Sequence, residues 1–213
     1  MARLDRAAVI AGAWDFVEAH GLDALTMRKL ASSLGVNHGT LYWHVENKRA
    51  LVDALAEDLL AGVADVDPAH QGADRLIALA GRLRSALLSH RDGARVMAGT
   101  FVRQPNTLAF GEAAIAAARA AGAQSADAAL AAFSVQYFVL GFTIEEQAHQ
   151  QLTAADAQPT DTADTTDFDA DRFPLVASAL DTMREIPRDA QFDYGVRQLV
   201  RSLRFTERRG RSD

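Results

Sequence analysis

The segment that decides the fold is "LASSLGVNHGTLYWHVENKRAL", residues 30–51. Its apolar residues recur mostly at every third or fourth position, which is helical spacing. Tyr42, Trp43 and His44 stand side by side against that pattern. Because Leu41 and Val45 repeat at i, i+4 and face inward, the residues between them face outward. The sequence therefore predicts a short helix that exposes two large aromatic side chains.

Capping residues divide the first 65 residues into four helices. Thr26, Asn37 and Asn47 are suited to cap the second, third and fourth helices, and Gly21 and Gly35 to end the first and second. The fourth helix is expected over residues 48–63. Two short helices joined by a tight glycine-containing turn are the sequence form of a helix-turn-helix. The third helix is therefore predicted to enter the major groove of DNA.

Beyond residue 65 the pattern changes to six mostly longer helices, predicted over 73–90, 94–99, 105–121, 125–152, 174–185 and 189–204. Between the fourth and fifth of these, residues 153–171 carry six Asp and no Lys or Arg, which is typical of a solvated, mobile loop. We therefore expect an all-α protein with two domains. Residues 1–65 form the helix-turn-helix domain with its linking helix, and residues 66–208 form a larger helical domain.

Composition and charge narrow the function. With 213 residues and 49% hydrophobic content the chain can build a proper core, and the absence of cysteine excludes disulfide scaffolds and Cys-ligated zinc fingers. A net charge of −6 argues against a protein that coats nucleic acid with its whole surface. No secretory signal and no run of about 18 apolar residues is found, so we expect a cytoplasmic protein with no membrane partner.

Three segments of the first domain, "RLDRAAVI" (3–10), "LTMRKLASSLGV" (25–36) and "TLYWHVENKRALVDALA" (40–56), resemble the DNA-binding head of the tetracycline-repressor family. The likeness continues in "ALLSHRDGARVMAGT" (86–100) and "YFVLGFTIEEQAHQ" (137–150), and is weakest over 153–171. It implies a homodimeric transcriptional repressor that binds a palindromic operator in double-stranded DNA and is released by a small-molecule effector. It also implies that the chain is not an enzyme and needs no cofactor.

The resemblance also assigns DNA contacts. In the family the arginine of the second helix reads a guanine, and the aromatic pair lies at the DNA face of a very short recognition helix. This chain departs from the family at the start of that helix, so its operator sequence should differ. The implied DNA-binding residues are Arg28, Asn37, His38, Gly39, Thr40, Tyr42, Trp43, His44 and Lys48.

The effector domain departs from the family at the positions that bind magnesium-tetracycline. The family's metal-ligating histidine falls at Met97, its arginine at Phe101, its polar drug contacts at Ala64 and Leu79, and an aromatic wall at Leu83. A thioether and hydrocarbons cannot hold a hard, oxygen-preferring cation. We therefore expect no metal site and a more apolar effector. The expected effector-binding residues are Leu79, Leu83, Met97, Thr100, Phe101, Phe110, Phe133, Phe142 and Glu145, with Val176, Leu180 and Met183 reaching in from the partner subunit.

Several alternatives stay open at this point. Tyr42 and Trp43 could complete a small core instead of facing DNA, and the effector positions could close a dry core without a pocket. The chain could also be a small-molecule-binding or ligand-modifying helical protein without specific DNA binding. Glu145, Glu146 and His149 could reach a ligand or the partner, or simply form a solvated helix face. The dimer interface is expected on the helix from Ser125 and on the last helix, through Phe192, Val196, Leu199, Val200 and Leu203.

Overall fold

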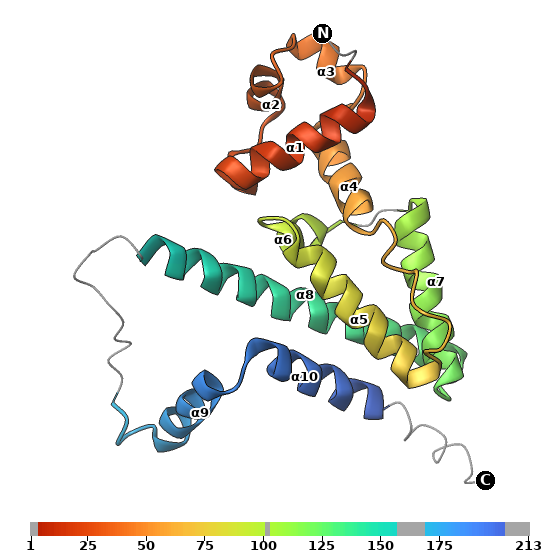
Figure 1. Cartoon of the computed structure of the whole chain (residues 1–213), viewed down its shortest axis with the longest axis vertical. Helices are drawn as coiled ribbons and strands as arrows, with labels where there is room; N and C mark the ends of the chain where they lie inside the picture. Colours follow the sequence, from red (N-terminus) through yellow and green to blue (C-terminus); the bar gives the residue numbers. More distant parts are fainter. Residues whose placement is uncertain (1–3, 101–102, 157–168, 203–213) are drawn as a thin grey trace.

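The computed structural model describes residues 4–100, 103–156 and 169–202. Over these residues it contains ten α-helices, one short 3-10 helix and no strand, which agrees with the all-α expectation. A small head of three helices lies at one end, and a single helix, α4, leads from it into a larger body (Figure 1). The last helices of the chain lie on the side of the body away from the head.

The head consists of α1 (Arg6–His20), the 3-10 helix η1 (Leu22–Ala24), α2 (Met27–Ser33) and α3 (His38–Tyr42), and α4 (Lys48–Leu59) follows it. The expected N-caps are confirmed: the side chains of Thr26, Asn37 and Asn47 accept hydrogen bonds from the backbone N–H groups of residues 29, 39 and 50. Gly21 and Gly35 take positive φ angles of 77° and 65°, as expected where the first two helices end. Helix α4 is shorter than expected, because turns replace its last residues after Leu59.

The body consists of α5 (Gly72–Leu88), α6 (Gly93–Met97), α7 (Pro105–Ala120), α8 (Ser125–Asp156), α9 (Pro174–Glu185) and α10 (Arg188–Ser202), close to the six expected helices. Helix α5 is central and packs against α7, α8 and α10. Its inner face is a column of fully enclosed leucines: Leu76, Leu79, Leu83 and Leu87. This apolar column fixes the body as one packed unit.

Helix α8 corrects two expectations. It continues to Asp156, so the first four residues of the expected loop 153–171 are helical, and residues 157–168 lie outside the described part of the chain. By length and composition the stretch Ala126–Thr153 could also cross a membrane, although the sequence was expected to hold no such segment. In this fold α8 packs against α5, α7 and α10, which is typical of the long core helix of a globular protein.

Helix α10 corrects the expected dimer interface. Phe192, Val196 and Val200 are at most 6% exposed within a single chain, where α10 packs on α8 and α5. Leu199 is half-buried, and Leu203 lies outside the described residues. Helical periodicity identifies an apolar face but does not show which surface covers it. Here α8 and α5 of the same chain cover this face, so the stripe belongs to the chain's own core. It therefore carries no argument for a second subunit.

Candidate nucleic-acid interface and ligand pocket

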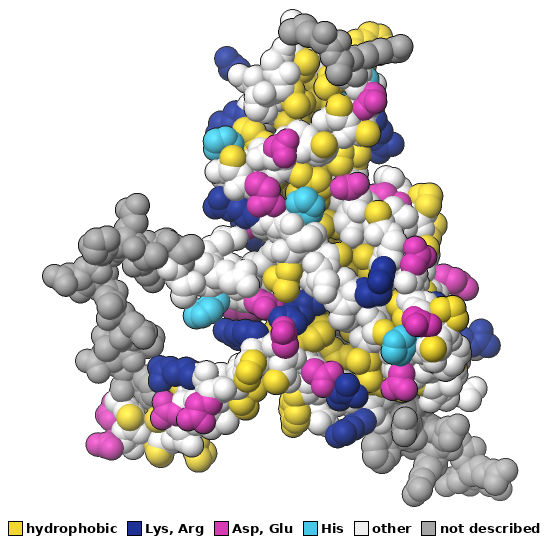
Figure 2. Space-filling view, in the orientation of Figure 1, with side chains coloured by type: hydrophobic (Ala, Val, Ile, Leu, Met, Phe, Trp, Pro, Cys, Tyr) yellow, Lys and Arg dark blue, Asp and Glu magenta, His cyan; other side chains and the backbone are white. Residues whose placement is uncertain are grey.

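Helix α3, the expected recognition helix, is only five residues long and buries a single side chain, Leu41. The Tyr42 side chain is 43% exposed and that of Trp43 is 89% exposed, so the alternative that they complete a small core is wrong. Exposed apolar surface of this size on the head indicates a binding face. Figure 2 shows Lys and Arg side chains on both flanks of the head, where they could meet phosphates.

The start of α3 has a defined geometry. The Asn37 side-chain oxygen accepts the Gly39 N–H at 2.8 Å, so this oxygen is occupied by capping. The His38 ring meets the Tyr42 ring edge-on, with centroids 4.8 Å apart and planes at 88°. His38 therefore limits the rotation of Tyr42 on the exposed face. The other expected DNA contacts also belong to the head or to the start of α4: Arg28, Gly39, Thr40, Trp43 and Lys48 are exposed, and His44 is half-buried.

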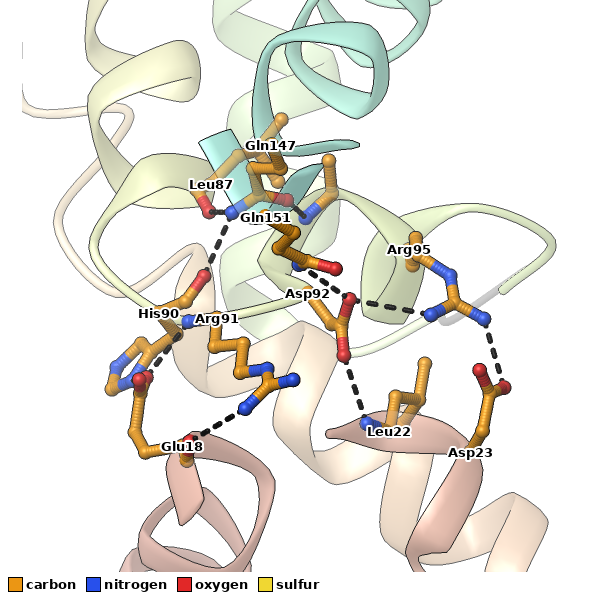
Figure 3. Close-up of polar contacts among 11 residues, drawn as sticks. Glu18, Leu22, Asp23, Leu87, His90, Arg91, Asp92, Arg95, Gln147 and Gln151 are labelled. Carbon is orange, nitrogen blue, oxygen red and sulfur yellow. Dashed lines mark hydrogen bonds and ion pairs between the residues drawn. The ribbon is translucent and has the colours of Figure 1, made fainter. Parts of the chain in front are cut away.

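A hydrogen-bonded junction connects the head to the body (Figure 3). Its centre is Asp92, which is 2% exposed and takes a left-handed backbone with φ 59°. Its carboxylate accepts the Leu22 N–H of η1 at 2.8 Å and the Gln151 amide of α8 at 3.1 Å. Arg95 lies between two carboxylates and donates to Asp92 at 3.3 Å and to Asp23 of the head at 2.8 Å.

A second group of contacts lies beside Asp92. The Glu18 carboxylate accepts the Arg91 backbone N–H at 2.8 Å, and Nδ1 of His90 lies 3.2 Å from the same oxygen. The His90 ring stacks on Trp14 of α1, with centroids 4.0 Å apart. Gln147 of α8 fixes this corner from the side of the body, because its amide bonds to three backbone groups at Leu87, His90 and Ala94. This junction could not be predicted from the sequence, since most of its partners are more than 50 residues apart.

Acid should weaken this junction. Burial raises the pKa of Asp92, but hydrogen bonds from Leu22 and Gln151 and the charge of Arg95 outweigh burial and lower that pKa below its ordinary 3.8. Because the pKa of Asp92 is lower in the folded than in the unfolded chain, its carboxylate stabilises the fold fully above pH 3.8. This stabilisation is lost as the pH falls from 3.8 through the pKa of the folded state. We expect Asp92→Asn to cost about 2 kcal/mol of unfolding free energy near neutral pH.

The measurement is denaturant unfolding of wild type and Asp92→Asn at several pH values between about 6 and 3. The difference between the two proteins should shrink below pH 3.8, because there the unfolded wild-type chain takes up a proton more readily than the folded carboxylate does. Asp15→Asn, at an exposed position of α1, is the matched control and should show little difference at any pH. A difference for Asp92→Asn that is independent of pH would contradict the assignment.

The expected effector residues separate into three groups: residues buried in the body core, exposed residues, and residues that line a pocket. Leu79, Leu83, Met97 and Phe110 are at most 5% exposed in the body core, and the Thr100 hydroxyl donates to the Met97 carbonyl at 2.7 Å. Phe101 lies outside the described residues. Phe133 is 49% exposed on α8, and Val176 and Leu180 are exposed on α9.

Three of the expected residues, Phe142, Glu145 and Met183, come together, although Met183 was expected from the partner subunit and here belongs to the same chain. They line a pocket of about 520 Å³ between α8, α9 and the start of α10. Its other walls include Phe138, Leu152, His149, Arg188 and Gln191. One side of the pocket is therefore apolar and aromatic, and the other carries charged and hydrogen-bonding groups, as ligand pockets commonly do.

Glu146, next to Glu145, has a different role. It is 6% exposed and forms an ion pair with Arg84 of α5, at 2.7 Å. The Glu146 hydrogen bond raises the pKa of Arg84 above its ordinary value, against desolvation, which lowers it. This guanidinium also packs over the Phe142 and Phe192 rings. Glu146 therefore has a structural role and does not form part of a solvated helix face.

A larger groove of about 760 Å³ lies between α5 and α10, but it contains none of the expected effector residues. Its most buried cation, Arg84, is already bonded to Glu146 and Asp189. In the described part of the chain, no group of three or more His, Cys, Asp or Glu side chains is arranged to hold a metal ion.

Comparison with known proteins matches both parts of the chain. Residues 9–55 match the family described as bacterial regulatory proteins, tetR family, and residues 67–204 match the tetracyclin repressor-like C-terminal domain. The chain belongs to the tetracycline-repressor family. Tetracycline repressor protein class A from transposon 1721 of Escherichia coli is 38% identical over 95% of this chain and 92% of its own length.

Solved structures of the tetracycline-repressor family superpose over nearly the whole chain. A possible TetR family transcriptional regulator from Streptomyces coelicolor A3(2) has a TM-score of 0.82 at 38% identity, covering 94% of this chain and 98% of that one. TetR-Q116A from Acinetobacter baumannii AYE, in complex with minocycline, has a TM-score of 0.71 at 34% identity, covering 95% and 97%. BioQ with its double-stranded DNA operator has a TM-score of 0.70 at 32% identity, covering 94% and 98%. Members of this family are DNA-binding regulators with a second domain for ligands.

Proposed function

We propose that the chain is a ligand-responsive transcriptional repressor, which binds a palindromic operator as a homodimer and is released by a small-molecule effector. The observation that carries the proposal is the exposed aromatic and polar face of α3 on a capped helix-turn-helix. We propose that the protein acts in the cytoplasm, without an enzymatic activity and without a cofactor. Residues 1–65 would be the operator-binding unit and residues 66–208 the effector-binding and dimerisation unit.

For operator binding, the proposed roles follow the exposed face of the head. Arg28 and His38 read base edges, and Tyr42 and Trp43 lie along sugars and thymine methyl groups. Thr40, His44, Lys48 and the backbone at Gly39 supply the remaining contacts. Asn37 acts through its capping bond, which fixes the first turn of α3. Base reading at the start of the helix then depends mainly on His38.

The test of this function is binding of the purified protein to the DNA upstream of its own gene. One sequence should bind much more tightly than unrelated duplexes, and its affinity should fall steeply with salt, because phosphate contacts release counterions. Equal affinity for all duplexes would contradict the proposal. That outcome would favour the alternative of a ligand-binding helical protein without specific DNA binding.

For effector binding, we propose the pocket between α8, α9 and the start of α10. The expected residues Leu79, Leu83, Met97 and Phe110 lie in the body core outside this pocket, and Thr100 is bonded to Met97 beside them. Phe142 and Met183 provide apolar walls, while Glu145 is exposed and able to anchor a polar group. Phe133, Val176 and Leu180 are exposed in one chain, where a second subunit could place them over the ligand. An effector that binds the released conformation about 3 to 5 kcal/mol more tightly would shift the population a few hundredfold or more.

We expect no response to magnesium-tetracycline, although the relatives are named tetracycline repressors. Met97 is 5% exposed, and Leu79 and Leu83 are fully buried, so these positions offer only a thioether and hydrocarbon. Isothermal titration of tetracycline with and without magnesium chloride should show no metal-dependent binding, with the class A repressor as the positive control. Submicromolar, metal-dependent binding that also releases DNA would show that the pocket comparison is wrong.

A further inference from the structure

The first turn of α7 is capped by a residue of another helix. Gln104, at the N-cap position, makes no side-chain capping bond in the described structure. Instead, the backbone N–H groups of Asn106 and Thr107 donate to the Glu57 carboxylate of α4, at 2.6 and 3.1 Å. The Thr107 hydroxyl donates to the same carboxylate at 2.7 Å. The Asn106 side-chain amide donates to the Glu57 backbone oxygen at 3.2 Å.

This contact is electrostatically favourable. The first N–H groups of a helix have no partner inside the helix, and the positive end of its dipole attracts a carboxylate. Glu57 supplies that charge, and Thr107 adds a third hydrogen bond to it. Because all three bonds end on one side chain, the direction of the Glu57 side chain fixes the position of α7 relative to α4.

The neighbouring residue, Asp58, connects α4 to the head. Its carboxylate accepts the indole N–H of Trp14 at 2.9 Å, and Trp14 is 5% exposed in the head core. Two consecutive carboxylates of α4 therefore bind opposite partners, one in the body and one in the head. Lys48, at the start of the same helix, lies about 13 Å from Glu57 along the axis at 1.5 Å per residue. A small rotation of α4 at Glu57 therefore also moves Lys48, at the end of α4 that is proposed to bind DNA.

We infer that Glu57 is a positioning residue for operator binding: by capping α7 it holds α4, and with it α3, in the orientation that DNA requires. The inference rests on the proposed function as an operator-binding repressor. Along the sequence, the capped turn of α7 lies between Thr100 and Phe110, which are both candidate effector positions. Movement of this turn therefore changes the orientation of the head through Glu57.

The experiment compares Glu57→Gln, Thr107→Ala and the double variant in the full chain. The operator is a duplex selected from upstream DNA with wild-type protein, and affinity is measured by fluorescence anisotropy after stoichiometric titration of the active fraction. Each single variant should bind about tenfold more weakly, within the usual range of coupling between sites. The double variant should be no weaker than Glu57→Gln, because both changes break the same contact. Glu112→Gln, an identical change at an exposed position of α7, should bind like wild type.

Hydrogen exchange at Asn106 and Thr107 reports separately whether the cap is broken. Unchanged affinity in Glu57→Gln with loss of protection at these amides would overturn the inference, and so would fully additive losses in the double variant. If Glu57→Gln does not fold, Thr107→Ala decides, since it removes only one hydrogen bond; wild-type affinity there would overturn the inference too. Failure of the wild-type protein to select any duplex would instead contradict the proposed function.

Discussion

Replacing Tyr42 with alanine is expected to lower operator affinity by about a hundredfold or more, because each of two heads loses a contact worth about 1 to 3 kcal/mol. The ring is 43% exposed and held edge-on by His38, so it is placed to meet DNA without reordering. The inward side chain of α3 is Leu41, and Tyr42 contributes little to the core of the head. Thermal unfolding should therefore change little.

Tyr42→Phe is the matched control for this prediction. It keeps the ring and its contact with His38 and removes only the hydroxyl, so most of the affinity should survive. A gel-shift or anisotropy titration against the selected operator measures both variants. Wild-type affinity in Tyr42→Ala would remove Tyr42 from the DNA interface and weaken the whole assignment of α3.

Replacing Tyr137 with aspartate is expected to convert a dimer into monomers. Leu130, Phe133 and Tyr137 recur at i, i+3 and i+7 on α8 and are 67%, 49% and 65% exposed, whereas Ala128, Val135 and Val139 on another face of this helix are buried in the body. Contiguous apolar surface of this kind indicates a protein contact. On α10 the outward Tyr194 is 68% exposed, on the face opposite the buried stripe. A charge buried in such an interface without a partner costs several kcal/mol.

Sedimentation of wild type at micromolar concentration should show a dimer, and Tyr137→Asp a folded monomer. Operator affinity should fall with it, because a single short recognition helix makes too few base contacts. Leu108→Asp, at an apolar position of α7 that is 57% exposed, is the control and should stay dimeric. A wild-type protein that sediments as a monomer would contradict the homodimer itself.

The head and most helix boundaries could be predicted because their signals are local. Thr26, Asn37 and Asn47 cap helices through hydrogen bonds that span two or three residues, and such bonds depend on sequence neighbours alone. The exposed face of α3 followed from the inward pair Leu41 and Val45. The candidate DNA site was therefore accessible from the sequence with the family resemblance beside it.

The features that could not be predicted depend on which surfaces of the chain pack against each other. Val196 and Val200 formed an obvious apolar stripe, but periodicity could not show that α8 and α5 of the same chain cover it. Asp92, Gln147 and Glu57 looked like ordinary polar residues, since their partners lie far away along the chain. The expected effector positions do not share one site, because Leu79 and Met97 are buried in the core while Glu145 and Met183 line a separate pocket.

The placement of the tryptophans has a practical consequence. The chain has two, and they occupy opposite environments: Trp14 is enclosed at the junction between head and body, and Trp43 is 89% exposed on the proposed DNA face. Indole emission depends on solvent contact. The junction between head and body and the exposed face of α3 therefore each carry an intrinsic fluorophore of their own. Because the sequence contains no cysteine, a single introduced thiol can be labelled without background. Head movement and DNA docking can thus be followed as separate optical signals in one molecule.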